Sequence, residues 1–71
     1  MKKIELETGG TVWKILTKPG DLVEEGDILF ILEVMKMEVP YEAPISGEVV
    51  AVHIAEGDFV EEDQLALEIA D

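Results

Sequence analysis

The chain has 71 residues, enough for one small domain, and 48% of them are hydrophobic. It contains no cysteine and a single histidine, His53, so disulfides, thiolate metal sites and histidine clusters are excluded. Seventeen acidic residues oppose five lysines, which gives a formal net charge of −12. Such a surface repels phosphate backbones and anionic lipid, and no apolar run reaches membrane-spanning length. We therefore expect a soluble, monomeric, cytoplasmic protein that binds neither nucleic acid nor membrane.

Short strands separated by turns account for the first half of the chain. Alternating charged and apolar residues predict strands, whereas clusters of proline, glycine and aspartate predict turns. In chain order, we expect a strand over 2–7, a break at 8–10, a strand over 11–17, a turn at 18–21, a short strand at 22–23, a turn at 24–27 and a buried strand over 28–32.

The second half repeats this pattern. Residues 10–33 laid over residues 47–70 give seven identical pairs in 24, all at an offset of 37. The turn that contains Gly20-Asp21 recurs at Gly57-Asp58, and apolar positions recur around both turns. Two copies are too few for a solenoid, so we expect one domain with internal pseudo-two-fold symmetry.

No segment carries a helical apolar stripe of adequate length, which predicts an all-β protein. A duplicated unit of four short strands suggests a flattened barrel or sandwich of two four-stranded sheets. The segment between the copies should form a hairpin that projects from one end. By the symmetry, the chain termini should meet at the opposite end.

That central segment reads Glu33-Val34-Met35-Lys36-Met37-Glu38-Val39. Strands on both sides place Lys36 at or beside the tip of a tight reversal. Exposed methionines beside it are unexpected, because apolar side chains are stabilised by leaving water. By itself the lysine could be an ordinary solvated residue, and Met35 and Met37 could share a packed strand face.

Several further motifs surround this triplet and are similar to those of the biotinyl domain family. That family carries a glycine-led first strand, two Gly-Asp-x-Val turns, a Met-Lys-Met site and an Ala-Pro-x-x-Gly segment. The corresponding segments here are Gly10-Thr11-Val12, Gly20-Asp21-Leu22-Val23, Met35-Lys36-Met37, Ala43-Pro44-Ile45-Ser46-Gly47 and Gly57-Asp58-Phe59-Val60. The resemblance covers nearly the whole chain.

The resemblance implies that Lys36 carries covalent biotin and that Met35 and Met37 are read by a biotin protein ligase. It further implies a carrier, not an enzyme, that shuttles carboxybiotin between biotin carboxylase and carboxyltransferase sites. An exposed amine is mostly protonated and a poor nucleophile, so the ligase must supply an activated acyl group. We expect no catalytic residues and no metal site.

The sequence departs from the family pattern at three points, and three alternative functions remain open. Val34 stands where the family commonly has alanine, the segment before Gly10 lacks the usual proline, and the chain between Lys14 and Asp21 has no room for the "thumb" of some acetyl-CoA carboxylase carriers. The last departure favours a carrier of the pyruvate carboxylase, transcarboxylase or decarboxylase kind. The alternatives are a lipoyl carrier, which usually has Asp-Lys-Ala at its tip, a dual biotin and lipoyl acceptor, and an unmodified structural barrel.

Other polar and aromatic residues receive structural interpretations. We expect Trp13 and Phe30 in the core or at its edge, and Tyr41 in a packing role close to the hairpin. We expect His53 to face solvent or a partner, and Glu33 and Glu38 to influence partner contacts. The repeated pairs Glu24-Glu25 and Glu61-Glu62 are predicted to lie in solvated turns.

Overall fold

A computed structural model describes all 71 residues, and it is built from eight strands. No helix in it is long and apolar enough to cross a membrane. In chain order the strands are β1 (Lys2–Glu5), β2 (Gly10–Ile15), β3 (Leu22–Val23), β4 (Ile28–Val34), β5 (Met37–Glu42), β6 (Gly47–Val52), β7 (Phe59–Val60) and β8 (Leu65–Ala70).

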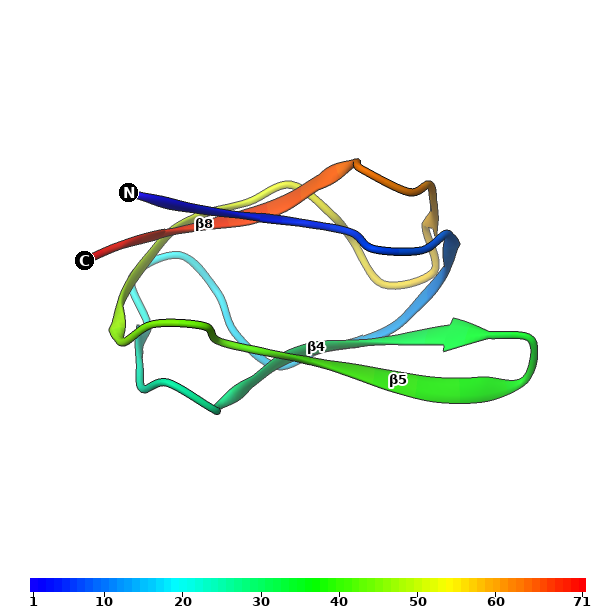
Figure 1. Cartoon of the computed structure of the whole chain (residues 1–71), viewed down its shortest axis with the longest axis horizontal. Coiled ribbons are helices and arrows are strands. Elements are labelled where there is room, and N and C mark those ends of the chain that lie inside the picture. Colours follow the sequence, from blue (N-terminus) through cyan, green and yellow to red (C-terminus); the bar gives the residue numbers. More distant parts are fainter.

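The strands form two four-stranded antiparallel sheets, which confirms the predicted all-β class. One sheet has the order β1-β8-β6-β3 and the other has the order β5-β4-β2-β7. The β4–β5 hairpin extends beyond the rest of the barrel at one end, and both termini lie at the other end, as Figure 1 shows. The expected positions of hairpin and termini are therefore confirmed.

Hydrogen bonds that fix the turns recur at the offset of 37. The Gly20 N–H donates to the Val49 carbonyl at 2.7 Å, and the Gly57 N–H donates to the Val12 carbonyl at 2.7 Å. Both glycines have positive φ, 96° and 90°, which a residue without Cβ adopts freely. The equivalence continues outside residues 10–33 and 47–70, because Gly26 N–H donates to Ala43 O and Asp63 N–H donates to Leu6 O.

Aspartates complete the same turns. The Asp21 carboxylate accepts a hydrogen bond from the Lys18 N–H at 3.0 Å, and the Asp58 carboxylate accepts one from the Ala55 N–H at 3.0 Å. Such local bonds to the backbone are the reason why aspartate favours turns. The Gly-Asp-x-Val motif is therefore a turn whose glycine supplies the backbone conformation and whose aspartate closes the loop.

The core lies between the sheets and contains only apolar side chains. Phe30 is fully buried, as predicted, and its ring stacks on Tyr41 with centroids 4.7 Å apart. The buried residues are Ile4, Leu6, Val12, Val23, Leu29, Phe30, Leu32, Ala43, Val49, Ile54, Val60, Ala66, Leu67 and Ile69.

Trp13 is neither in this core nor among the side chains packed against it, so the prediction of a position in the core or at its edge is wrong. The register between β2 and β4 shifts between Val12 and Lys14, which makes Trp13 the extra residue of a β-bulge. Its side chain is 45% exposed, and the Lys14 ammonium lies 5.7 Å from the ring centroid. Ile28, expected in a wholly buried strand, is 41% exposed because it stands at the start of β4.

Candidate functional site

A two-residue turn joins β4 to β5 at the projecting end of the barrel. Val34 pairs with Met37 across the hairpin, which leaves Met35 and Lys36 as the two central residues. Their φ angles are 51° and 65°, both in the left-handed region. Two successive positive φ values define a type I′ turn, whose twist matches that of the flanking strands.

The residues in this turn are unusual for its geometry. Type I′ turns favour Asn-Gly or Asp-Gly, because a side chain with a Cβ is strained at positive φ. A non-glycine residue in this region costs on the order of 1–3 kcal/mol and persists only where its surroundings enforce it. Six paired positions between β4 and β5 provide that enforcement. A strained turn made of Met35 and Lys36 suggests that these side chains serve a purpose other than stability.

Both methionine side chains are held in solvent. Met35 is 91% exposed and Met37 is 65% exposed, although each is apolar. Met35 is left-handed and not extended, so the two side chains do not share one packed strand face. The packing interpretation of the two methionines is therefore wrong. Val34, at the base of the hairpin, does pack against the core and so anchors the turn to the barrel.

Lys36 is exposed at the tip and forms no ion pair. The ion pairs of the structure are those of the N-terminus with Asp71 and of Lys18 with Asp21, and His53 is hydrogen-bonded to Glu68. The Lys36 ammonium thus has no competing partner, while its backbone is fixed by the turn. A side chain placed in this way can be reached by another protein from several directions.

Two carboxylates lie just behind the tip. Glu33 on β4 and Glu38 on β5 are directly opposite in the hairpin ladder, and both are exposed. Neither forms a salt bridge with Lys36 or with any other cation. Like charges opposite each other destabilise a strand pair, so this arrangement does not stabilise the hairpin.

The remaining sequence candidates lie away from the tip. The Tyr41 ring packs on Phe30, and its hydroxyl accepts a hydrogen bond from the Glu7 N–H at 3.1 Å, so Tyr41 has the predicted packing role. His53 is exposed, as expected, and its Nε2 lies 2.8 Å from a Glu68 carboxylate oxygen. These contacts assign Tyr41 and His53 to the scaffold.

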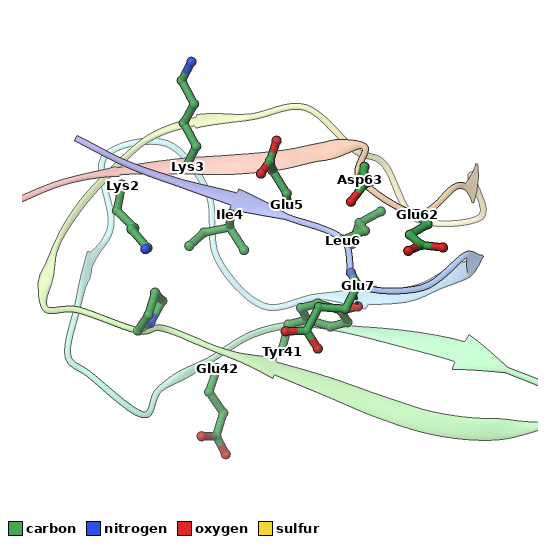
Figure 2. Close-up of a pocket in the computed structure, with 11 residues that line it drawn as sticks. Lys2, Lys3, Ile4, Glu5, Leu6, Glu7, Tyr41, Glu42, Glu62 and Asp63 are labelled. Atoms are coloured by element: carbon green, nitrogen blue, oxygen red, sulfur yellow. Dashed lines mark hydrogen bonds between the residues drawn. The ribbon is translucent and has the colours of Figure 1, made fainter.

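A shallow groove of about 580 Å³ runs between the edge strands β1 and β5. Figure 2 shows Tyr41 between these strands, with Glu7 beside it and Glu62 and Asp63 at one end. The groove does not include Lys36 or either tip methionine. Sequence reasoning did not predict it, because it depends on how two edge strands from different halves face each other.

Comparison with known proteins shows which family the chain resembles. Residues 3–69 match the biotin/lipoyl family, which is described as "Biotin-requiring enzyme". The chain is 43% identical over 67 residues to the biotin/lipoyl attachment protein of Bacillus subtilis, covering 94% of this chain and 92% of that one. It is 45% identical over 60 residues to the pyruvate carboxylase of the same organism, covering 84% of this chain and 5% of that one.

A solved structure agrees with these sequence matches. The urea carboxylase of Kluyveromyces lactis contains a region that superposes on 97% of this chain with a TM-score of 0.90 and 36% identity. That region is 6% of the carboxylase chain, so the two carboxylases are much larger than the segment that they share with this protein. The fold, the family match and these relatives together show that the chain belongs to the biotin/lipoyl attachment family, as a domain homologous to the carrier domains of biotin-dependent carboxylases.

Proposed function

We propose that the protein is a biotin carrier domain, in which a biotin protein ligase attaches biotin to the Nζ of Lys36. One observation supports this most strongly. An exposed lysine without an ion pair occupies a strained hairpin tip, between two methionines that are 91% and 65% exposed. The barrel needs none of these three side chains for its core.

The site fits biotin because an amide-linked group requires only an accessible amine and a rigid attachment point. The hairpin supplies both, and no cavity is needed to hold the cofactor. During attachment, the Lys36 nitrogen forms a bond to the activated acyl carbon that the ligase supplies. The bond to the activating group breaks, and the amine proton passes to a base on the ligase. Met35 and Met37 offer the ligase apolar contacts that few surface turns provide.

When attached, biotin supplies the carboxyl-carrying chemistry, and the protein supplies position and exposure. Linking the cofactor to a mobile domain raises its effective concentration at each enzyme that it visits. The partners proposed are therefore a biotin carboxylase and a carboxyltransferase, either as subunits or as domains. The relatives named pyruvate carboxylase and urea carboxylase support this assignment.

Expression with a biotin ligase and excess biotin tests the proposal. We expect the intact mass to increase by one biotinyl group and the product to bind streptavidin. The Lys36→Arg variant keeps the positive charge but lacks the primary amine, so it should show neither signal. A wild-type protein that stays unmodified under these conditions would not be a biotin carrier, and one that also stays unmodified with a lipoate ligase would be a structural barrel.

A lipoyl carrier is the second candidate, favoured by the relative named biotin/lipoyl attachment protein. Parallel expression with a lipoate ligase and lipoic acid separates the possibilities by intact mass. Addition of a lipoyl group alone would favour the second candidate, and addition of either group would identify a dual acceptor. Replacing both Met35 and Met37 with alanine should reduce biotin attachment more than lipoyl attachment if the methionines are read by the biotin ligase.

A further inference from the structure

The two sheets of the barrel are related by the internal repeat, so each provides a control for the other. A position on the outer face of the sheet β5-β4-β2-β7 has its counterpart 37 residues away on the sheet β1-β8-β6-β3. Positions needed only for the scaffold should be similar in the two sheets. Positions at which the sheets differ point to a task that one sheet alone performs.

The clearest difference lies in the row behind the hairpin. On the hairpin sheet this row is Lys14, Ile31 and Pro40, paired across β2, β4 and β5. The equivalent row on the other sheet is Ala51, Glu68 and Lys3. There Glu68 lies opposite Lys3 in the strand register, and its carboxylate is hydrogen-bonded to His53 at 2.8 Å. The hairpin sheet instead presents Ile31 and Pro40, with the half-exposed Trp13 indole on the adjacent bulge.

A second row lies closer to Lys36 and combines an aromatic ring with acids. Phe59, Thr11, Glu33 and Glu38 are paired in sequence across β7, β2, β4 and β5. Phe59 is 88% exposed, although an aromatic side chain is stabilised by leaving water. It lies two strand spacings from Glu33, roughly 10 Å across the sheet. The equivalent row on the other sheet is Leu22, Glu48 and Ala70, so both sheets expose an apolar side chain at this position of β3 and β7. Only the hairpin sheet has an aromatic ring there and two unpaired carboxylates that face each other beside the tip.

We infer that this outer face, defined by Trp13, Ile31, Glu33, Glu38 and Phe59 and called here the carrier face, docks on the enzyme that carboxylates the attached biotin. The inference rests on the proposed function. The partner surface that fits has an apolar pocket for Phe59 and basic side chains opposite Glu33 and Glu38. Enzyme sites that bind phosphates and bicarbonate are cationic, and an acidic carrier face is attracted toward such a site. The carrier face is continuous with the tip, so docking there would hold Lys36 at the entrance.

The ligase is expected to read the tip, whereas the carboxylating enzyme reads the carrier face as well. Biotin attachment by the ligase and carboxylation of the attached biotin can therefore be measured separately for each variant. Each variant is first biotinylated, and the extent of labelling is measured by mass. The labelled domain is then given as substrate to the biotin carboxylase of the source organism with ATP and bicarbonate, and kcat/KM is compared with that for free biotin.

Phe59→Ala should lower kcat/KM of the labelled domain about tenfold while its labelling by the ligase stays unchanged. Leu22→Ala is the matched control, because Leu22 is the repeat equivalent of Phe59, is 82% exposed and lies on the other sheet. It should change kcat/KM less than twofold. Melting curves of the two variants should agree, since neither side chain is buried.

Glu33→Gln combined with Glu38→Gln should lower kcat/KM several-fold at low salt and weaken its dependence on ionic strength. The control is Glu24→Gln combined with Glu48→Gln, which changes the net charge equally at exposed positions away from the tip. Removing the repulsion between Glu33 and Glu38 should not lower the melting temperature, so unfolding cannot explain a loss of activity.

The outcomes separate the two proposals. A domain that is labelled on Lys36 but is carboxylated equally well with or without Phe59 would overturn the carrier face and leave the carrier function standing. Equal losses in the Phe59 and Leu22 variants would also overturn it. A wild-type domain that cannot be biotinylated would remove the biotin carrier function and the carrier face together.

Discussion

At the hairpin end of the barrel, β4 runs into β5 through two left-handed residues, whereas at the other end β8 and β1 lie side by side without a peptide bond between them. The turns and ladders behind these two ends match at the offset of 37. At the terminal end, the Met1 ammonium lies 3.2 Å from an Asp71 carboxylate oxygen, which is an exposed contact. Only the continuous connection fixes a lysine backbone rigidly in solvent. The two ends of the barrel therefore rest on equivalent turns and strand ladders, but only the hairpin end exposes a lysine on a fixed backbone.

The largest effects are expected in the core, where the two halves should behave alike. Leu32 on β4 and Ile69 on β8 are repeat equivalents, and both are fully buried. Replacing either with alanine should lower the free energy of unfolding by about 2–5 kcal/mol, through lost burial and a residual cavity. Such a loss is comparable to the whole stability of many domains of this size, so urea titrations should show both variants largely unfolded. A large difference between them would contradict an equal division of the core between the halves.

Glycine substitutions should distinguish the two ends. A Cβ at Gly10 would lie 2.7 Å from the Glu33 carbonyl oxygen and 3.0 Å from Val34 Cγ2, just before the turn. A Cβ at Gly47 would clash with the Ala70 carbonyl oxygen on the terminal strand β8. We expect Gly10→Ala and Gly47→Ala each to lower the free energy of unfolding by about 1–3 kcal/mol.

Only Gly10→Ala should also slow biotin attachment, because it displaces the strand that enters the hairpin. Labelling rates measured under conditions where both variants are folded provide the comparison. Equal rates for the two glycine variants would show that the ligase tolerates a displaced hairpin base.

A smaller effect is expected from relieving the backbone strain at Met35 in the hairpin turn. Met35→Asn places a residue that tolerates positive φ at a position whose native side chain is 91% exposed. We expect the free energy of unfolding to rise by about 0.5–1 kcal/mol, while biotin attachment slows because a ligase contact is lost. Asp63→Gly is the control, since Asp63 has φ of 70° and is the repeat equivalent of Gly26. It should stabilise the fold without changing attachment.

The smallest effect concerns acid stability and the turn that contains Asp21. The backbone N–H of Lys18 donates to Asp21 and, with the Lys18 side chain 3.3 Å away, lowers the pKa of this carboxyl below its ordinary value. The carboxylate therefore stabilises the fold above the pKa of an unfolded aspartate, and the contribution is lost as pH falls through the lower folded pKa. Asp21→Asn should make the melting temperature fall less steeply between about pH 5 and about pH 2. A slope equal to that of wild type would assign the acid sensitivity to other groups.

Local chemistry made much of the fold predictable from the sequence. Gly20-Asp21 and Gly57-Asp58 specify turns by themselves, because positive φ and the aspartate hydrogen bond depend on a few neighbouring residues. The reversal at Lys36 was predictable because strand-like runs stand on both sides of it. The role expected for Met35, Lys36 and Met37 came from the resemblance to the biotinyl domain family, because the residues alone left a packing role for the methionines open.

Features that depend on partners across the sheets were not predictable. Trp13 is apolar and stands in a strand, and only the shifted register of β2 against β4 shows that a bulge exposes it. The equivalence of Leu6 and Ala43 is visible in backbone hydrogen bonds but involves no identical residues. The row from Phe59 to Glu38 joins segments that are distant in sequence, so it requires the cross-strand pairing.

Five lysines compete for any label in this chain, and their separation gives the most direct test. The protein is expressed with a biotin ligase, digested, and mapped by tandem mass spectrometry. Our account predicts biotin on Lys36 alone, with Lys2, Lys3, Lys14 and Lys18 unmodified, and no labelling of Lys36→Arg. Biotin on any of the other four lysines, or labelling that persists in the arginine variant, would contradict the hairpin tip as the attachment site.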